Sequence, residues 1–276
     1  MNVKIIIPIL NPQESFFTEL IPALLKQILR PNILLINSGS PIPHGEYEVL
    51  NIEKKEFNHA NTRNLAMEYE ADFYLFMTQD ALPYDVFLIE NLVRSFQDER
   101  VVVSYARQIP YSEADPIEKF ARKTNYPTES RLKTKDDLAT LGIKTFFSSD
   151  SCAMYRGDYF RSVGGFTLDL NTNEDMEFAA RAILNGKKVA YAHEAKVYHS
   201  HNFTLLQVWQ RYRQIGKFFA GNRWILNAVA QYSNAESTGI RQAIYELKYL
   251  YKYAPLSIPK SVLFSLTKYI AFKSSF

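Results

Sequence analysis

The first half of the chain alternates short apolar runs with longer segments in which apolar residues recur at helical spacing. The apolar runs predict strands at Val3–Pro8, Ile33–Asn37, Glu48–Ile52, Phe73–Met77 and Val101–Arg107. The segments between them predict helices at Glu14–Ile28, Ala60–Glu70 and Asp85–Phe96. Because strands that alternate with helices are typical of an α/β fold, we expect a mainly parallel central sheet flanked by helices.

The second half of the chain has a less regular pattern. Residues Asp115–Phe147 are rich in charge and weak in periodicity, which favours helical excursions or a loop over the site. Beyond them the pattern predicts strands at Ser151–Arg156, Lys188–Ala190 and Ala195–Tyr198, and helices at Gly157–Val163 and Glu174–Asn185. From Thr204 onward the spacing is helical. We therefore predict an α/β domain over residues 1–203 and a helical extension over residues 204–276.

Composition is that of a folded, cytoplasmic protein. In 276 residues, 47% are hydrophobic and 14% aromatic, which is enough to bury a substantial core and excludes a disordered chain. The single cysteine, Cys152, has no partner for an intramolecular disulfide, and Met1 leads straight into a strand-like segment without a signal peptide. No stretch approaches the roughly 18 uncharged apolar residues that a membrane-spanning helix needs. We therefore expect a cytoplasmic location.

The C-terminal extension differs from the rest of the chain in charge. Residues 241–276 contain six basic residues and one acid, for a net charge of +5, while the remaining 26 basic and 28 acidic residues give −2. Aromatic residues lie among these lysines and arginines, a composition suited to the surface of an anionic membrane, here the inner face of the plasma membrane. The alternative is that the aromatics pack on the α/β domain or form a homodimer contact. No recognition motif supports a nucleic-acid partner.

Two fingerprints of nucleotide-using enzymes are missing from the sequence. It contains no G-x-x-x-x-G-K-[ST] phosphate loop, and no G-x-G-x-x-G follows the first strand. Kinase-like and dinucleotide-dependent functions therefore lose support, and attention falls on polar residues at strand ends.

Asp80 follows the apolar strand Phe73–Met77 in the sequence Thr78-Gln79-Asp80. Ligands of open α/β sheets bind at the carboxyl ends of strands, so this carboxylate is expected at the rim of a site. Mg²⁺ or Mn²⁺ bound to a diphosphate prefers such oxygen ligands. The alternative is an ordinary aspartate that starts a turn before Pro83.

Glu174 and Asp175 open a predicted helix, which Asn173 or a nearby residue is expected to cap. Acidic residues in a first helical turn are stabilised by the helix dipole, and this is the alternative to a catalytic role. A carboxylate held at that position can accept a proton from an incoming hydroxyl, and general base catalysis contributes about 10²–10⁴ in rate. Asp175 is the candidate base.

Two histidines follow the strand Ala195–Tyr198, in the sequence His199-Ser200-His201. Side chains alternate in direction along a strand, so one imidazole is expected to face the site. A neutral imidazole can complete a metal shell. We choose His199 as the ligand and keep His201 in reserve, the alternative being a hydrogen-bonded surface histidine.

The segment from Phe57 to Asn64 places hydrogen-bond donors at the start of the predicted helix Ala60–Glu70. Anions bind readily at helix N-termini. Arg63 is a candidate to engage a diphosphate or a base, and Asn64 to hold the loop. The alternative is that Arg63 is simply solvated.

Taken together, these segments resemble glycosyltransferase family 2, a family of inverting enzymes with the GT-A fold. The matching segments are Ile5-Ile6-Ile7-Pro8 with Asn11, Ile36-Asn37-Ser38-Gly39-Ser40, His59 to Asn64, Thr78-Gln79-Asp80-Ala81 with Pro83, Gly164-Gly165-Phe166 and Glu174-Asp175. Within the family, the chain is most similar to bacterial rhamnosyltransferases that use dTDP-L-rhamnose. The segments that carry this resemblance are Phe57-Asn58-His59 to Asn64, Thr78-Gln79-Asp80-Ala81 and His199-Ser200-His201-Asn202. The resemblance implies a GT-A catalytic domain, Rossmann-like, over residues 1–203.

The resemblance also implies roles for individual residues. It makes Asp175 the catalytic base with Glu174 beside it, and it places Asp80 at the last position of the family's D-x-D metal motif, with His199 as a further ligand. It places Pro8, Asn11 and Asn37 in the nucleotide pocket. We expect Ser38, Arg63, Asn64 and Gln79 to bind the donor with them.

The chain departs from the family pattern at two positions. Asn37 stands where an acid usually contacts the nucleotide base, and Thr78 stands at the first position of D-x-D. Recognition of the base is therefore expected to differ. Metal binding is expected either to depend on the donor diphosphate and His199 or to be dispensable.

The implied reaction is transfer, with inversion, of L-rhamnose from dTDP-L-rhamnose to a lipid-linked or polysaccharide acceptor in cell-surface glycan synthesis. The alternative within the enzyme class is a UDP-hexose donor. The alternative from another class is a catalytically silent sugar-nucleotide-binding subunit of a glycan assembly complex. The incomplete D-x-D motif favours the silent subunit, and the presence of Asp175 argues against it.

Overall fold

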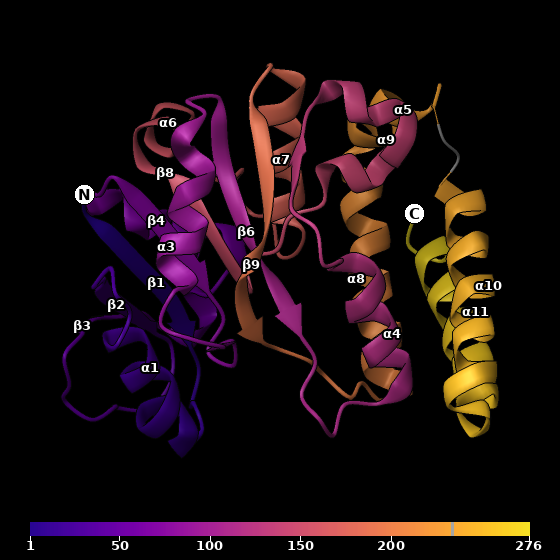
Figure 1. Cartoon of the computed structure of the whole chain (residues 1–276), viewed down its shortest axis with the longest axis horizontal. Coiled ribbons are helices and arrows are strands. Elements are labelled where there is room, and N and C mark those ends of the chain that lie inside the picture. The colour runs from indigo at the N-terminus through magenta and orange to yellow at the C-terminus, as the bar shows by residue number, and fades with distance from the viewer. Residues whose placement is uncertain (233–234) are drawn as a thin grey trace. The chain divides into compact units, whose positions relative to one another are not determined.

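The computed structural model describes residues 1–232 and 235–276 (Figure 1). The described residues form two compact units. The first unit comprises Met1–Gln108, Thr128–Lys135 and Phe146–His199, and the second comprises Ile109–Pro127, Asp136–Thr145 and Ser200–Phe276. The second unit thus draws on two segments of the charged middle region as well as on the C-terminal helices.

One sheet organises the first unit, with strand order β3-β2-β1-β4-β8-β6-β9-β5. Its parallel half consists of β1 (Val3–Ile9), β2 (Asn32–Asn37), β3 (Glu48–Asn51) and β4 (Phe73–Met77). Strand β1 pairs in parallel with both β2 and β4, and β2 pairs in parallel with β3. The carboxyl ends of these four strands therefore lie at one edge of the sheet.

The other half of the sheet is antiparallel. Strand β8 (Cys152–Arg156) pairs antiparallel with β4 and with β6 (Val101–Ile109). Strand β9 (Lys188–Tyr198) pairs antiparallel with β5 (Leu82–Pro83) and β7 (Arg131–Lys133). The parallel pairing expected from the sequence is thus confirmed for the half that begins the chain, and the α/β class is confirmed for the whole.

The expectation of two strands at 188–190 and 195–198 is wrong, because β9 runs through both. Ala192, between them, is buried in the core, and Tyr191 pairs with Arg131 of β7. Pairing with β7, which the weak pattern of the middle region did not reveal, keeps this stretch extended.

The predicted helices of the first half are divided into shorter turns. They are a π-helical turn Phe16–Leu20 with α1 (Ile21–Leu25), α2 (His59–Asn64) with a 3₁₀ turn Leu65–Glu68, and α3 (Leu88–Val93) with a 3₁₀ turn Arg94–Gln97. A further 3₁₀ turn spans Lys54–Glu56. Except for the partly buried Pro8, the apolar residues of β1, β2 and β4 are buried, as expected for strands covered on both faces.

Helices α6 (Gly157–Ser162) and α7 (Glu174–Leu184) complete the first unit. An aromatic cluster packs them against the sheet, with ring centroids 5.0–5.6 Å apart between Phe160, Phe166 and Phe178. Phe76 of β4 and Tyr155 of β8 join the cluster from the sheet. Because these side chains are almost completely buried, they fix the first turn of α7 relative to β8.

The second unit is helical. It contains α4 (Pro116–Asn125), α5 (Leu138–Leu141), α8 (Leu205–Gly221), α9 (Arg223–Val229), α10 (Ala235–Tyr253) and α11 (Ile258–Lys273), with 3₁₀ turns at Lys135–Asp137, Gly142–Phe146 and Pro255–Ser257. Helices α10 and α11 run side by side (Figure 1). The apolar core here includes Ile117, Val208, Leu250 and Phe264. Pro255 and Pro259 lie at the break between α10 and α11, because proline cannot continue a helix from the preceding turn.

Among residues 1–232 and 235–276, the helices are each too short or too polar to cross a lipid bilayer.

Candidate active site

Polar residues gather where β1, β2 and β4 end, and hydrogen bonds tie these three strand ends together. The Leu10 N–H donates to Gln79 Oε1 across 2.9 Å, which joins the end of β1 to the segment after β4. The Ser40 N–H donates to Asn11 Oδ1, also at 2.9 Å, which joins the segments after β1 and β2. The structure therefore brings Asn11, Ser40 and Gln79 to one edge, as the strand-end argument predicts.

Asn37, the residue that replaces the family's acid, is buried and engaged in the turn that follows β2. Its Nδ2 donates to Asn51 Oδ1 (3.0 Å) and to the Ser40 carbonyl (3.1 Å), while its Oδ1 accepts from the Gly39 N–H (3.0 Å). Ser38 is also buried, and its hydroxyl donates to the Ile9 carbonyl. These contacts hold the turn after β2 in place, and a direct contact of Asn37 or Ser38 with a donor stays a prediction.

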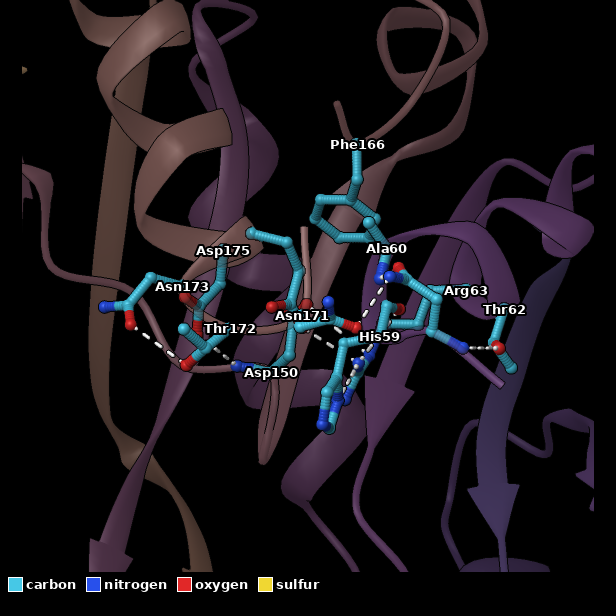
Figure 2. Close-up of polar contacts among 12 residues, drawn as sticks. His59, Ala60, Thr62, Arg63, Asp150, Phe166, Asn171, Thr172, Asn173 and Asp175 are labelled. Atoms are coloured by element: carbon cyan, nitrogen blue, oxygen red, sulfur yellow. Dashed lines mark hydrogen bonds and ion pairs between the residues drawn. The ribbon is translucent and has the colours of Figure 1, made fainter. Parts of the chain in front are cut away.

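Asp175 lies in the first turn of α7, and both of its carboxylate oxygens accept backbone hydrogen bonds. Oδ1 accepts from the Met176 N–H at 2.7 Å, and Oδ2 accepts from the Asp150 N–H at 3.1 Å (Figure 2). Of the two expected sources of a cap, Asn173 or a nearby residue, the structure shows the second. Asn173 adopts a left-handed conformation (φ 59°) and its side chain makes no cap bond, so Asp175 itself satisfies a free N–H of the first turn.

Arg63 lies on α2 and points inward, with a side chain only 4% exposed. Asn58 caps helix α2, since its side chain accepts from the N–H groups of Ala60 and Asn61. Arg63 Nη1 donates to Glu174 Oε1 at 2.9 Å, and Arg63 Nε lies 3.6 Å from Asp150 Oδ2. The alternative of a solvated arginine is therefore excluded.

Asp150 belongs to this cluster, and the sequence reasoning missed it. It lies two residues before β8, is buried, and accepts a hydrogen bond from the Tyr155 hydroxyl at 2.7 Å. It follows a segment without periodicity and matches no short motif, so its only signal was a carboxylate next to a buried strand. Its place in the cluster depends on the pairing of β4 with β8, which the sequence did not predict.

Burial and neighbouring charge control the ionisation of these acids. Burial, followed by the charge of Glu174, raises the pKa of Asp175 to about 6, although its two backbone hydrogen bonds and Arg63 oppose the shift. Burial also raises the pKa of Asp150. A carboxylate whose pKa is near the working pH can both hold and release a proton, which is the property required of a general base.

Asn64 holds a loop, as the sequence reasoning anticipated. Its Nδ2 donates to the Phe166 carbonyl (2.8 Å) and its Oδ1 accepts from the Phe166 N–H (2.9 Å). Gly165 passes close to the Asn64 side chain with a φ of 72°, and a Cβ at this position would lie 2.4 Å from Asn64 Oδ1. Both polar atoms of the side chain are thus used within the protein, and a donor contact by Asn64 stays a prediction.

His199 and Asp80 approach each other, with 3.4 Å between Nε2 and Oδ1. His199 is buried, and its Nδ1 lies 2.9 Å from Gln108 Oε1, while Gln108 Nε2 donates to Ser149 Oγ. Because Nδ1 is engaged by Gln108, Nε2 is the ring nitrogen that faces the Asp80 carboxylate. The pair therefore offers one nitrogen and one oxygen atom as candidate metal ligands.

The donor set fits a divalent cation. Adjacent ligand atoms of an octahedral Mg²⁺ site, with bonds of roughly 2.1 Å, lie about 3 Å apart, close to the observed separation. Thr78, at the first position of the D-x-D motif, has a buried Oγ1 without a hydrogen-bond partner in the described part of the chain. His201, held in reserve, follows two residues after His199 and lies in the second unit.

Two hydrogen bonds connect the segment that carries Asp80 with the candidate base. The Thr78 N–H donates to the Ser151 carbonyl at 3.3 Å, and Asp150, the preceding residue, donates to Asp175. Because β4 and β8 are antiparallel neighbours, the end of β4 lies beside the start of β8. The metal candidates and the acidic cluster are thus at the same edge of the sheet.

One edge of this α/β sheet therefore carries both an acidic cluster and a carboxylate–imidazole pair. The profile described as "Glycosyl transferase family 2" matches residues 4–164, and one described as "Glycosyl transferase family group 2" matches residues 89–274. The chain belongs to glycosyl transferase family 2. It is 38% identical to O-antigen chain rhamnosyltransferase RfbN of Salmonella typhimurium, across 99% of this chain and 89% of the relative, and 37% identical to O-antigen chain rhamnosyltransferase WbaN of Salmonella anatum, across 99% and 88%.

Solved structures confirm the fold. The mannosyltransferase PcManGT from Pyrobaculum calidifontis, in complex with GDP-Man and Mn²⁺, superimposes with a TM-score of 0.63 at 14% identity, across 99% of this chain and 87% of that one. Residues 1–349 of S. aureus TarS give a TM-score of 0.55 at 15% identity, across 100% and 90%.

Proposed function

We propose that this glycosyltransferase transfers L-rhamnose from dTDP-L-rhamnose, with inversion, to a lipid-linked or polysaccharide acceptor in bacterial cell-surface polysaccharide synthesis. The support for the sugar and the process is the similarity, over almost the whole chain, to two proteins named O-antigen chain rhamnosyltransferases. The observation that carries the chemistry is Asp175, a buried carboxylate with a pKa of about 6 at the edge of the sheet.

In this proposal Asp175 accepts the proton of an acceptor hydroxyl. The hydroxyl oxygen forms a bond to the anomeric carbon as the bond from that carbon to the diphosphate oxygen breaks, and the electron pair leaves with the nucleoside diphosphate. Asp80 and His199 would hold Mg²⁺ or Mn²⁺, which supplies positive charge for the departing diphosphate. Pro8, Asn11, Asn37, Ser38 and Gln79, at the ends of β1, β2 and β4, would contact the donor.

The structure offers support against a catalytically silent subunit. A scaffold would be expected to avoid burying three carboxylates around one guanidinium, since unpaired buried charge is costly. Glu174, Asp150 and Asp175 are nevertheless held there with Arg63. Such a retained cluster of perturbed groups is typical of a functional site.

We also propose that α11 binds the anionic inner face of the plasma membrane, close to a lipid-linked acceptor. Its exposed side chains at helical spacing are large and apolar: Val262, Leu263, Leu266, Tyr269 and Ile270. Glu246, the acid of residues 241–276, is buried and accepts a hydrogen bond from Ser261. The exposed charges of this segment are therefore basic, which suits an anionic lipid surface and disfavours a second copy of the same face.

The experiment that tests the donor measures release of nucleoside diphosphate from dTDP-L-rhamnose, UDP-glucose, UDP-galactose and UDP-N-acetylglucosamine, each with Mg²⁺ or Mn²⁺. We expect turnover with dTDP-L-rhamnose at least roughly tenfold above the others, about 1.4 kcal/mol of discrimination. Preferred turnover of a UDP sugar would replace the donor assignment. Release from none of them, with binding retained, would favour the silent subunit.

A further inference from the structure

We infer that Arg63 is a positioning residue for the base and does not bind the donor. This inference rests on the proposed role of Asp175 and adds a function for the residue that organises its surroundings. It also changes the expectation from the sequence, which placed Arg63 on the diphosphate or the nucleotide base.

The contacts of the guanidinium point away from a donor role. Arg63 Nη1 donates to Glu174 Oε1 (2.9 Å) and to the backbone carbonyl of His59 (3.2 Å), and Nε faces Asp150 Oδ2 at 3.6 Å. The side chain is 4% exposed, and its carboxylate partners Glu174 and Asp150 are 6% and 3% exposed. A group enclosed to this degree has little surface to offer a ligand.

The two acids that Arg63 holds are the two neighbours that place Asp175. Glu174 directly precedes Asp175 at the start of α7, and Asp150 donates its N–H to Asp175 Oδ2. Arg63 therefore links α2 to the first turn of α7, which carries Asp175, and to the segment before β8, which donates a hydrogen bond to Asp175 (Figure 2). A planar guanidinium can reach two carboxylates in different directions at once, which the single point charge of a lysine cannot reproduce.

Arg63 also acts on the charge of the base. The charged groups around Asp175 are Glu174 on its own helix, Asp150 before β8 and Arg63 on α2, with the Tyr155 hydroxyl behind Asp150. Glu174 raises the pKa of Asp175, and Arg63 lowers it. Removing the charge of Glu174 should therefore lower the pKa of Asp175, and removing that of Arg63 should raise it. A purely structural role would not give this pair of opposite effects.

The test compares Arg63→Met, which keeps the length and removes the charge, with Arg63→Lys, Glu174→Gln and the exposed control Arg30→Met. For Arg63→Met we expect kcat to fall at least roughly tenfold at pH 7. We also expect the midpoint of the acidic limb of the kcat profile to move to higher pH by about one unit, equivalent to about 1.4 kcal/mol. Glu174→Gln should move this midpoint to lower pH. Arg63→Lys, which keeps the charge, should bring the midpoint closer to its wild-type pH than it brings kcat to its wild-type value. Arg30→Met should match the wild type in both.

Donor affinity, measured by calorimetry with dTDP, separates the two roles of Arg63. An unchanged dissociation constant in Arg63→Met supports positioning; a loss of affinity that parallels kcat, with an unmoved limb, would overturn it. If Arg63→Met does not fold, Glu174→Gln and Arg63→Lys test the inference in its place. An acidic limb at the wild-type pH in both variants would overturn it. The pH dependence of unfolding, compared with Asp175→Asn, reads the ionisation of Asp175 without activity and so separates failure of this inference from failure of the proposed reaction.

Discussion

The backbone N–H of Asp150 donates to Asp175 Oδ2 across 3.1 Å, joining two carboxylate residues that are 25 positions apart in the chain. The bond fixes the direction of the Asp175 carboxylate while leaving each oxygen with a further lone pair, because a carboxylate oxygen can accept more than one hydrogen bond. The Asp175 carboxylate is thus held in one orientation and can still accept a proton on either oxygen.

The pH dependence of turnover should show an acidic limb near pH 6. The base must be ionised to accept a proton, and burial, with the charge of Glu174, raises the pKa of Asp175 to about 6. Activity should therefore be nearly full at pH 8 and fall about tenfold per unit below the limb. Steady-state kcat between pH 5 and 9 checks this. A limb near pH 4 would show that the carboxyl is not perturbed.

Asp175→Asn should stabilise the protein at neutral pH. Since the pKa of Asp175 is higher in the folded chain than its ordinary value of 3.8, the folded state binds more protons between about pH 4 and 6, and the wild type loses stability as pH rises through that window. The rise in the pKa of Asp175 to about 6 corresponds to an upper limit of about 3 kcal/mol in the free energy of unfolding.

Urea unfolding of both proteins at pH 4 and pH 7.5 measures this difference. The two should be similar at pH 4, with the variant more stable at pH 7.5. If the two proteins were equally stable at both pH values, the pKa of Asp175 in the folded chain would not be raised.

Metal dependence should be lost when Asp80 or His199 is changed. We expect Asp80→Asn and His199→Ala to weaken the Mn²⁺-dependent part of donor binding by roughly tenfold or more, as loss of a ligand or its support commonly does. The exposed His44 provides a control, His44→Ala. Titration of donor with Mn²⁺ and with EDTA gives the measurement, and wild-type curves that coincide in both would show that metal is dispensable.

Membrane binding should depend on the apolar face of α11. Leu263→Ser combined with Leu266→Ser removes two side chains that are about half exposed, so the fold should be retained while flotation with liposomes containing anionic lipid decreases. Ile28→Ser, an exposed apolar residue of the first unit, is the control. Unchanged flotation of the double variant would favour packing or a homodimer contact for this face.

The sequence predicted most of what depends on local pattern. The parallel strands β1 to β4, the position of Asp175 in a first helical turn and the loop-holding role of Asn64 follow from periodicity and strand ends. What it missed depends on pairing between distant segments. Asp150 reaches the cluster because β8 inserts beside β4, and β9 is continuous because β7 pairs with it.

Arg63 shows a second limit. Its position at a helix start predicts a donor for anions, and the structure shows that the anions it pairs with are the protein's own carboxylates. Local pattern gives the chemistry a side chain can offer, whereas the partner it finds is determined by tertiary packing.

The most direct test of the account is the split between turnover and donor binding in Asp175→Asn. The account predicts that kcat for transfer falls by about 10²–10⁴, the contribution of a general base, while the dissociation constant of the donor stays within a few-fold of the wild type. Transfer at the wild-type rate, or loss of donor binding together with transfer, would contradict it.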